Sequence, residues 1–282
     1  MKGELVSFRT SDGIELPGFY ARAVHRNGKC AIFIHGLTGG FLDPKLVDAL
    51  GESCLRAGFD FFAFNNRGSG MITGFDQKGK WVKVGGSLER FEDCAKDIRA
   101  ALDFVQKRGC RKAVLMGHST GCQKSAYYQT TKRDKRVAAL VLLGPASDID
   151  VMKAKLKKKY GGVLALAKRM VKASKGKQLM PNDSLSALRY YSLYKPTSVE
   201  GNIFNYATGK MPRLAKINVP VFAVYGSKDN YAVYGPKREL AMLKENVKTR
   251  YESTIIAGAG HNFERHERDV ARAVGRFLNS LE

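Results

Sequence analysis

The sequence predicts an α/β protein in which helices cover both faces of a largely parallel sheet. Short apolar runs, each the length of one buried strand, recur along the 282 residues. Between them lie segments whose apolar residues are three or four positions apart, which is typical of amphipathic helices. Strands that alternate with helices predict parallel pairing, because each helix returns the chain to the same end of the sheet.

Eight strands are expected. The first two, at 4–10 and 14–22, flank Ser11, Asp12 and Gly13 and therefore predict a hairpin. The other six are apolar runs of the kind that is buried on both faces of a sheet. They occupy residues 30–35, 60–65, 112–117, 138–143, 219–225 and 251–256.

The clearest helix is expected at 87–108. Its apolar residues recur at helical spacing and would share one buried face: Leu88, Phe91, Ala95, Ile98, Leu102 and Val105. Further helices are expected at 43–57, 121–131, 236–245 and 264–281.

Residues 147–212 interrupt the alternation of strands and helices. A structureless loop of this length is uncommon in a compact domain. The segment contains helix-like pieces at 151–160, 162–174 and 184–191. It therefore predicts a helical cap, inserted into a core that consists of residues 1–146 and 213–282.

The charge of the chain is strongly basic and unevenly distributed. The sequence has 48 basic and 26 acidic residues, a net charge of +22, and residues 151–177 contain ten Lys or Arg and no Asp or Glu. This basic cap predicts weak binding to an anionic surface, and the alternative interpretation is a solvated helical face. The sequence has neither a helix-turn-helix pattern nor zinc-ligand spacing, so no specific nucleic-acid partner is expected.

The cysteines and the N-terminus bear on the compartment. Five cysteines, an odd number without metal-ligand spacing, favour reduced thiols in a cytoplasmic protein. Residues 1–10 lack the apolar segment of a signal peptide. No apolar run approaches the roughly 18 residues of a membrane span. A cytoplasmic protein without a metal site is expected.

Gly117-His118-Ser119-Thr120-Gly121 matches the pattern G-x-S-x-G. It directly follows an apolar strand and directly precedes an expected helix, which is the setting of a nucleophile elbow. Small neighbours leave room for strained backbone at the serine, and the helix N-terminus favours developing negative charge. Ser119 is therefore the expected nucleophile, and a glycine-rich turn with a capping serine is the alternative.

A serine nucleophile needs a base and a carboxylate that orients the base. His261 follows the last expected strand, and Asp229 follows the strand before it. The order Ser, Asp, His is the one expected for this architecture, and all three residues emerge at the carboxyl edge of the sheet. Asp148 and Asp150 are the alternative carboxylates.

Backbone N–H groups must stabilise the oxyanion of a tetrahedral intermediate. One is expected from Thr120 and the other from Leu37, in the loop after the strand at 30–35. His35 is expected to shape that loop through side-chain hydrogen bonds. The glycines of the loop lack a following Lys-Ser/Thr and the spacing G-x-G-x-x-G, so nucleotide binding is not expected there. A site of this kind requires no cofactor, and none is expected.

Four side chains are candidates for contact with a substrate: His35, Thr38, His118 and Tyr206. Thr38 lies in the expected oxyanion loop, and His118 lies in the elbow, where a structural role is the alternative. Tyr206 belongs to an aromatic set with Tyr190, Tyr191, Tyr194 and Phe204. These rings would either line a pocket or form the cap's own small core.

Taken together, these residues resemble the α/β-hydrolase superfamily over nearly the whole chain. The resemblance rests on the HG pair at 35–36, the pentapeptide at 117–121, Asp229 and the segment GAGH at 258–261. Residues 116–123 resemble the elbow of the DUF1749 group, which includes fungal siderophore esterases, and residues 36–40 are similar to that group's oxyanion segment. His35 and the turn NRGSG at 66–70 look more like general esterases and acylglycerol lipases. The resemblance implies ester hydrolysis through Ser119, Asp229 and His261.

The expected function is hydrolysis of small-molecule carboxylic esters with short to medium acyl chains, through an acyl-enzyme. A thioesterase, an amidase, an acylglycerol lipase, a siderophore-type esterase or an enzyme that cleaves carbon–carbon bonds are alternatives, because fold does not determine function. A non-catalytic ligand receptor, and a binder of membranes or nucleic acid through the basic segment, are alternatives from other classes.

Overall fold

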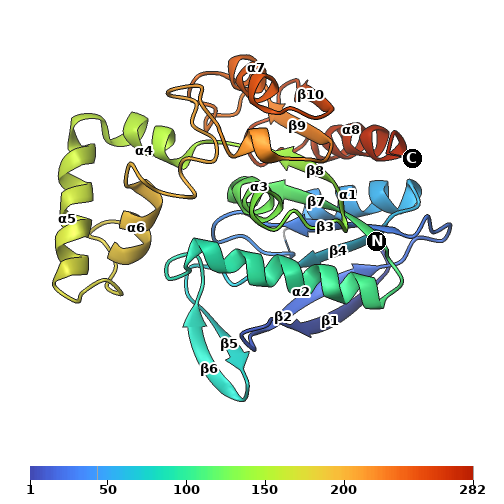
Figure 1. Ribbon diagram of the computed structural model, residues 1–282, viewed down its shortest axis with the longest axis horizontal. Coiled ribbons are helices and arrows are strands. Elements are labelled where there is room, and N and C mark those ends of the chain that lie inside the picture. Colours follow the sequence, from blue (N-terminus) through green and yellow to red (C-terminus); the bar gives the residue numbers. More distant parts are fainter. Residues whose placement is uncertain (43, 282) are drawn as a thin grey trace.

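The structure, a computed structural model, describes residues 1–42 and 44–281 (Figure 1). These residues form an eight-stranded sheet with the order β1-β2-β4-β3-β7-β8-β9-β10. β2 pairs antiparallel with β1 and β4, and all other neighbours pair parallel. The prediction of eight mostly parallel strands is therefore confirmed. Their bounds are β1 Glu4–Arg9, β2 Glu15–Ala21, β3 Lys29–Ile34, β4 Asp60–Phe64, β7 Lys112–His118, β8 Val137–Leu143, β9 Val221–Gly226 and β10 Tyr251–Ile256.

Helices cover both faces of this sheet, α1 and α8 on one face and α2, α3 and α7 on the other (Figure 1). Strand β3 shows the reason: Ile32 and Ile34 belong to the apolar cluster of one face, whereas Ala31 and Phe33 belong to the other. Because side chains alternate along a strand, a strand that is apolar at every position must be covered on both sides. The helix bounds are α1 Pro44–Arg56, α2 Cys94–Lys107, α3 Thr120–Lys132, α7 Pro236–Asn246 and α8 Glu267–Asn279.

Two helices of the predicted core begin later than the sequence predicts, and in the predicted cap the helix expected from residue 184 begins at Ala187. The helix expected from residue 87 begins at Cys94, after a 3-10 turn at Phe91–Asp93. Its first residues leave the helix because Glu89 is buried in ion pairs with Lys124 and Arg189. The helix expected from residue 264 begins at Glu267, because Phe263 and Arg265 have φ angles of 58° and 67°, which an α-helix does not allow. The helix expected at 43–57 starts at a residue outside the described ones.

The cap region contains α4 (Asp148–Leu156), α5 (Tyr160–Lys172) and α6 (Ala187–Tyr194), which lie beyond the carboxyl edge of the sheet (Figure 1). These helices share an apolar cluster of their own, which includes Tyr190 and Tyr194. Farther along the chain, Phe204 and Tyr206 are buried in the main core instead. The region predicted as a single cap is therefore divided between two clusters.

A two-stranded hairpin, β5 (Thr73–Gln77) with β6 (Lys80–Val84), stands apart from the main sheet (Figure 1). The sequence did not predict it. Its strands are short and its charged side chains largely exposed, so they give no apolar run of the kind that marks a core strand.

Several simpler features complete the fold. All five cysteines are unpaired and buried. Over residues 1–42 and 44–281, no helix combines the length and the apolar composition needed to cross a bilayer. Within the same residues, no three His, Cys, Asp or Glu side chains are grouped so as to hold a metal ion.

Candidate active site

Ser119 occupies a sharp turn between β7 and α3. Its φ and ψ angles are 55° and −126°, a conformation that costs free energy in any residue other than glycine. The neighbouring glycines make this turn possible. A Cβ atom at Gly121 would lie 2.0 Å from the Ile34 carbonyl oxygen, and one at Gly117 would lie 2.3 Å from the backbone of Gly121. The pentapeptide therefore forms the strained strand–turn–helix expected of it.

A chain of hydrogen bonds joins Ser119, His261 and Asp229. The distance from His261 Nε2 to Ser119 Oγ is 3.0 Å, and that from His261 Nδ1 to Asp229 Oδ2 is 2.9 Å. The Asp229 carboxylate, whose side chain is fully buried, accepts a hydrogen bond from Nδ1–H and so leaves Nε2 free to accept one from the serine. Asp148, one of the alternative carboxylates, instead accepts from Gln123 Nε2 at 2.8 Å.

Two further residues contact His261, one at its ring and one at its backbone. The Tyr231 ring stacks on the imidazole with centroids 4.2 Å apart, and His118 Nε2 lies 3.0 Å from the His261 carbonyl oxygen. Tyr231 was not predicted, since a tyrosine two residues after Asp229 carries no pattern in the sequence. The two contacts restrict the position of the His261 ring and backbone.

Ser119 faces a pocket of about 440 Å³, which Leu37, Thr38, Thr120 and His118 also line. The cap contributes a second wall, formed by Asp148, Val151, Met152, Lys155 and Tyr194. A larger hollow of about 600 Å³, between α1 and α8, contains none of these residues. The structure thus brings the two expected oxyanion donors and three of the four candidate contact residues, His35, Thr38 and His118, to one pocket.

Tyr206, the fourth candidate contact residue, does not lie in this pocket. Its side chain is 1% exposed, and its hydroxyl group donates to the Pro145 carbonyl oxygen at 2.6 Å. The ring stacks with Phe204 in the main core. The prediction that Tyr206 contacts the substrate is therefore wrong, because an aromatic ring with a satisfied hydroxyl group is more stable inside the core.

His35 holds the loop that carries Leu37. Its Nδ1 lies 2.8 Å from the Gly36 carbonyl oxygen, and its Nε2 accepts from the Asn66 backbone N–H at 3.0 Å. In the neutral form of the imidazole, both ring nitrogens therefore have a hydrogen-bond partner. Burial, with a contribution from the Lys124 charge, lowers the pKa of His35 to about 3.

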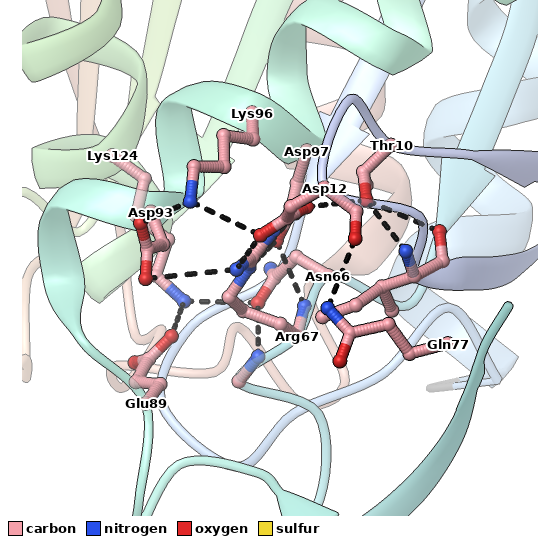
Figure 2. Close-up of polar contacts among 12 residues, drawn as sticks. Thr10, Asp12, Asn66, Arg67, Gln77, Glu89, Asp93, Lys96, Asp97 and Lys124 are labelled. Atoms are coloured by element: carbon pink, nitrogen blue, oxygen red, sulfur yellow. Dashed lines mark hydrogen bonds and ion pairs between the residues drawn. The ribbon is translucent and has the colours of Figure 1, made fainter. Parts of the chain in front are cut away.

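A buried polar network lies behind this loop (Figure 2). The Lys124 ammonium donates to Asn66 Oδ1 at 2.9 Å and pairs with Glu89 at 2.9 Å, and the Lys124 and Glu89 side chains are fully buried. Glu89 also pairs with Arg189, from α6, at 3.1 Å. Charged residues therefore link α6, α3 and the loop around His35. No pattern in the sequence indicated this network, because a lysine in a helix is normally exposed.

A second part of the same view centres on Arg67, which belongs to the turn at 66–70 (Figure 2). Its guanidinium pairs with Asp97 at 2.7 Å and with Asp12 at 3.0 Å. These pairs tie the turn to α2 and to the first hairpin of the chain.

The low pKa of His35 makes stability depend on pH. The unfolded chain takes up a proton at the ordinary histidine pKa of about 6.5, whereas the native chain does so only near 3. Stability is therefore full above pH 6.5 and falls as the pH drops toward 3, by up to roughly 4–5 kcal/mol from this group. Histidine NMR checks the premise: the His35 ring, assigned with a His35→Asn variant, should stay neutral well below pH 6. A titration of the His35 ring signals with a midpoint near pH 6.5 would contradict the low pKa.

The strand order and the strained serine between β7 and α3 define this protein as one with the α/β-hydrolase fold. The chain belongs to the family DUF1749, described as proteins of unknown function, whose profile matches residues 15–279. The resemblance of its elbow to that group is therefore confirmed. No curated protein is detectably similar to the chain in sequence.

Solved structures support the same fold. Est1E from Butyrivibrio proteoclasticus is 19% identical, with a TM-score of 0.62 and 99% of both chains covered. A thermostable carboxyl esterase from Bacillus coagulans, in complex with glycerol, is 14% identical, with a TM-score of 0.71, 100% of this chain and 99% of that chain covered. The Pyrococcus furiosus esterase Pf2001 is 16% identical, with a TM-score of 0.65, 99% of this chain and 91% of that chain covered. At these identities the likeness extends to the fold.

Proposed function

We propose that this protein is a serine hydrolase that cleaves carboxylic esters with short to medium acyl chains. The observation that carries the proposal is the hydrogen-bond chain from Ser119 Oγ through His261 to Asp229. A serine hydroxyl group is a weak nucleophile, and it becomes reactive only beside a base that is itself held in one orientation. Two esterases with the same fold, from Pyrococcus furiosus and Bacillus coagulans, are consistent with this chemistry.

In the proposed mechanism His261 Nε2 takes the Ser119 proton as Oγ attacks the ester carbonyl carbon. The N–H groups of Leu37 and Thr120 donate to the oxyanion that forms, and Asp229 stabilises the imidazolium. His261 then gives its proton to the leaving alcohol, and an acyl-enzyme remains on Ser119. Water, deprotonated by His261, attacks this acyl group. The bond between the carbonyl carbon and Ser119 Oγ then breaks, His261 returns the proton to Oγ, and the acid is released.

The pocket favours small acyl groups. Its volume is about 440 Å³, and on the cap side it is lined by charged as well as apolar side chains, among them Lys155 and Asp183. A long alkyl chain would have to pass these charged groups and desolvate them, which costs free energy. Est1E has been solved with bound ferulic acid, so an aromatic acid is a second acyl class to test.

A panel of nitrophenyl esters tests the proposal. We expect kcat/KM to be highest for acetate and butyrate, lower for octanoate and lowest for palmitate, because the pocket is small and partly charged. Matched thioesters and anilides separate ester hydrolysis from the alternative chemistries of the same triad. A preference for palmitate, or faster thioester than ester cleavage at equal acyl length, would contradict the proposal. Failure of a fluorophosphonate probe to label Ser119 would favour a ligand receptor.

A further inference from the structure

The basic residues of the cap form an exposed and unpaired surface. All ten Lys and Arg side chains of residues 151–177 are exposed. Among the described residues, none of these ten side chains forms an ion pair. The ion pairs of the cap are those of Arg189. We call these ten side chains the cationic cap surface. Residues 151–177 also contain no Asp or Glu, so no acidic side chain of the same segment offsets their ten positive charges.

The position of α5 explains why these charges face solvent. One side of the helix, which includes Val163, Leu164 and Met170, packs against the cluster of α6. The opposite side carries Lys168 and Arg169, and α5 is the cap helix that lies farthest from the sheet (Figure 1). An amphipathic helix with cations on its polar side is a typical membrane-surface element.

Exposed aliphatic side chains lie among these cations. Leu179 and Leu188 are 47% and 51% exposed. They adjoin the turn that contains Lys175 and Lys177, because Leu188 N–H donates to the Gly176 carbonyl oxygen at 2.8 Å. Aliphatic side chains between lysines suit the headgroup and acyl boundary of a bilayer. A single-stranded nucleic acid would instead be matched by exposed aromatic rings that stack on bases.

The cationic cap surface is continuous with the mouth of the Ser119 pocket. Lys155 belongs to both, and Val151 and Met152 of the same helix line the pocket. Met71, across the mouth, is 41% exposed and also lines it. The cationic cap surface therefore reaches the lining of the Ser119 pocket at Lys155.

We propose that the cationic cap surface docks on a bilayer that contains anionic lipids, with Leu179 and Leu188 entering the headgroup region. Each basic side chain near such a bilayer strengthens binding roughly fivefold, and the attraction falls within a Debye length. If the proposed esterase function also holds, docking brings the pocket to esters dissolved in the bilayer. Binding itself requires neither Ser119 nor turnover.

Vesicle sedimentation tests this docking. The full chain should bind vesicles of phosphatidylcholine with phosphatidylserine and not vesicles of phosphatidylcholine alone, and binding should weaken as salt rises. The variant Lys168→Glu/Arg169→Glu/Lys172→Glu should bind at least roughly a hundredfold more weakly, since the loss of three cations costs roughly fivefold each and the new carboxylates are repelled by the bilayer. The matched control is Arg268→Glu/Arg272→Glu/Arg276→Glu on α8, which makes the same change in net charge at exposed positions. It should keep binding within about threefold, because charges beyond a Debye length are screened.

Each outcome decides the proposal. Equal losses for the α5 and α8 variants would overturn it, since total charge alone would then account for binding. Leu179→Ser/Leu188→Ser should weaken vesicle binding and leave the retention of duplex DNA unchanged. Tighter binding to duplex DNA than to the anionic vesicles at the same salt would also overturn it, in favour of a nucleic acid. Ser119→Ala should bind vesicles normally, so failure of the esterase proposal would not affect this result.

Discussion

Replacing Ser119 with alanine should reduce kcat for the preferred nitrophenyl ester by a factor on the order of 10⁶. The alanine has no oxygen to attack the carbonyl carbon, and His261 then has no proton to accept. Asp229→Asn should reduce kcat by a factor on the order of 10⁴, because the amide cannot hold the tautomer in which Nε2 accepts from Ser119. Steady-state kinetics with a thermal melt of each variant measures both effects.

Asp150→Asn is the matched control for Asp229→Asn. Asp150 was an alternative partner for the base, and it lies in α4 outside the lining of the pocket. It should keep kcat within about tenfold, as expected of a residue that touches neither the base nor the nucleophile. Should Asp150→Asn lose as much activity as Asp229→Asn, or Ser119→Ala retain a substantial fraction of turnover, the proposed triad would be wrong.

Lys124→Met should lower the free energy of unfolding by about 3–5 kcal/mol. The substitution keeps the length of the side chain and removes its charge. Glu89 and Asn66 then lose a hydrogen-bond donor inside a region from which water is excluded, since the Lys124 and Glu89 side chains are fully buried. Urea unfolding at neutral pH, with the m-value checked for constancy, measures the change.

Lys96→Met removes a lysine that is partly exposed, and its effect on the free energy of unfolding is the comparison for Lys124→Met (Figure 2). The Lys96 side chain is 40% exposed, and it pairs with Asp93 and Asp12 at 2.8 and 3.0 Å. Its loss should cost at most about 1 kcal/mol, because water screens the pairs. The double variant Glu89→Gln/Lys124→Met should be less destabilised than the sum of its single variants, because Glu89→Gln removes the buried charge that Lys124 neutralises and the two side chains are in direct contact. If Lys124→Met lowered the free energy of unfolding no more than Lys96→Met does, the network would not stabilise the fold.

The network also connects Lys124 to the loop that carries Leu37, so its loss is expected to affect catalysis as well as stability. Asn66 links Lys124 to His35, and His35 in turn bonds to the Gly36 carbonyl oxygen next to Leu37. If the proposed oxyanion role of Leu37 holds, Lys124→Met should reduce kcat more than it raises KM at temperatures where the variant remains folded. This pattern is expected when a group acts on the transition state more than on the bound substrate.

Local patterns in the sequence determined the sheet, most of its helices and the placement of the nucleophile. An apolar run specifies a buried strand, because each of its side chains must leave water. The pentapeptide at 117–121 specifies the elbow, because glycine is required where a Cβ atom would meet backbone at 2.0 Å. Ser119, Asp229 and His261 each follow a strand, so parallel topology alone brings them to one edge of the sheet.

Contacts between distant parts of the chain were decided only by the tertiary structure. Glu89 leaves the predicted helix because Lys124 and Arg189 bury it, and Tyr206 lies in the core because the Pro145 carbonyl oxygen accepts from its hydroxyl group there. The stacking of Tyr231 on His261 likewise depends on two loops that meet at the same edge. Periodicity reports whether a residue prefers water or the interior, whereas the partner of a buried polar group is known only once the elements have packed together.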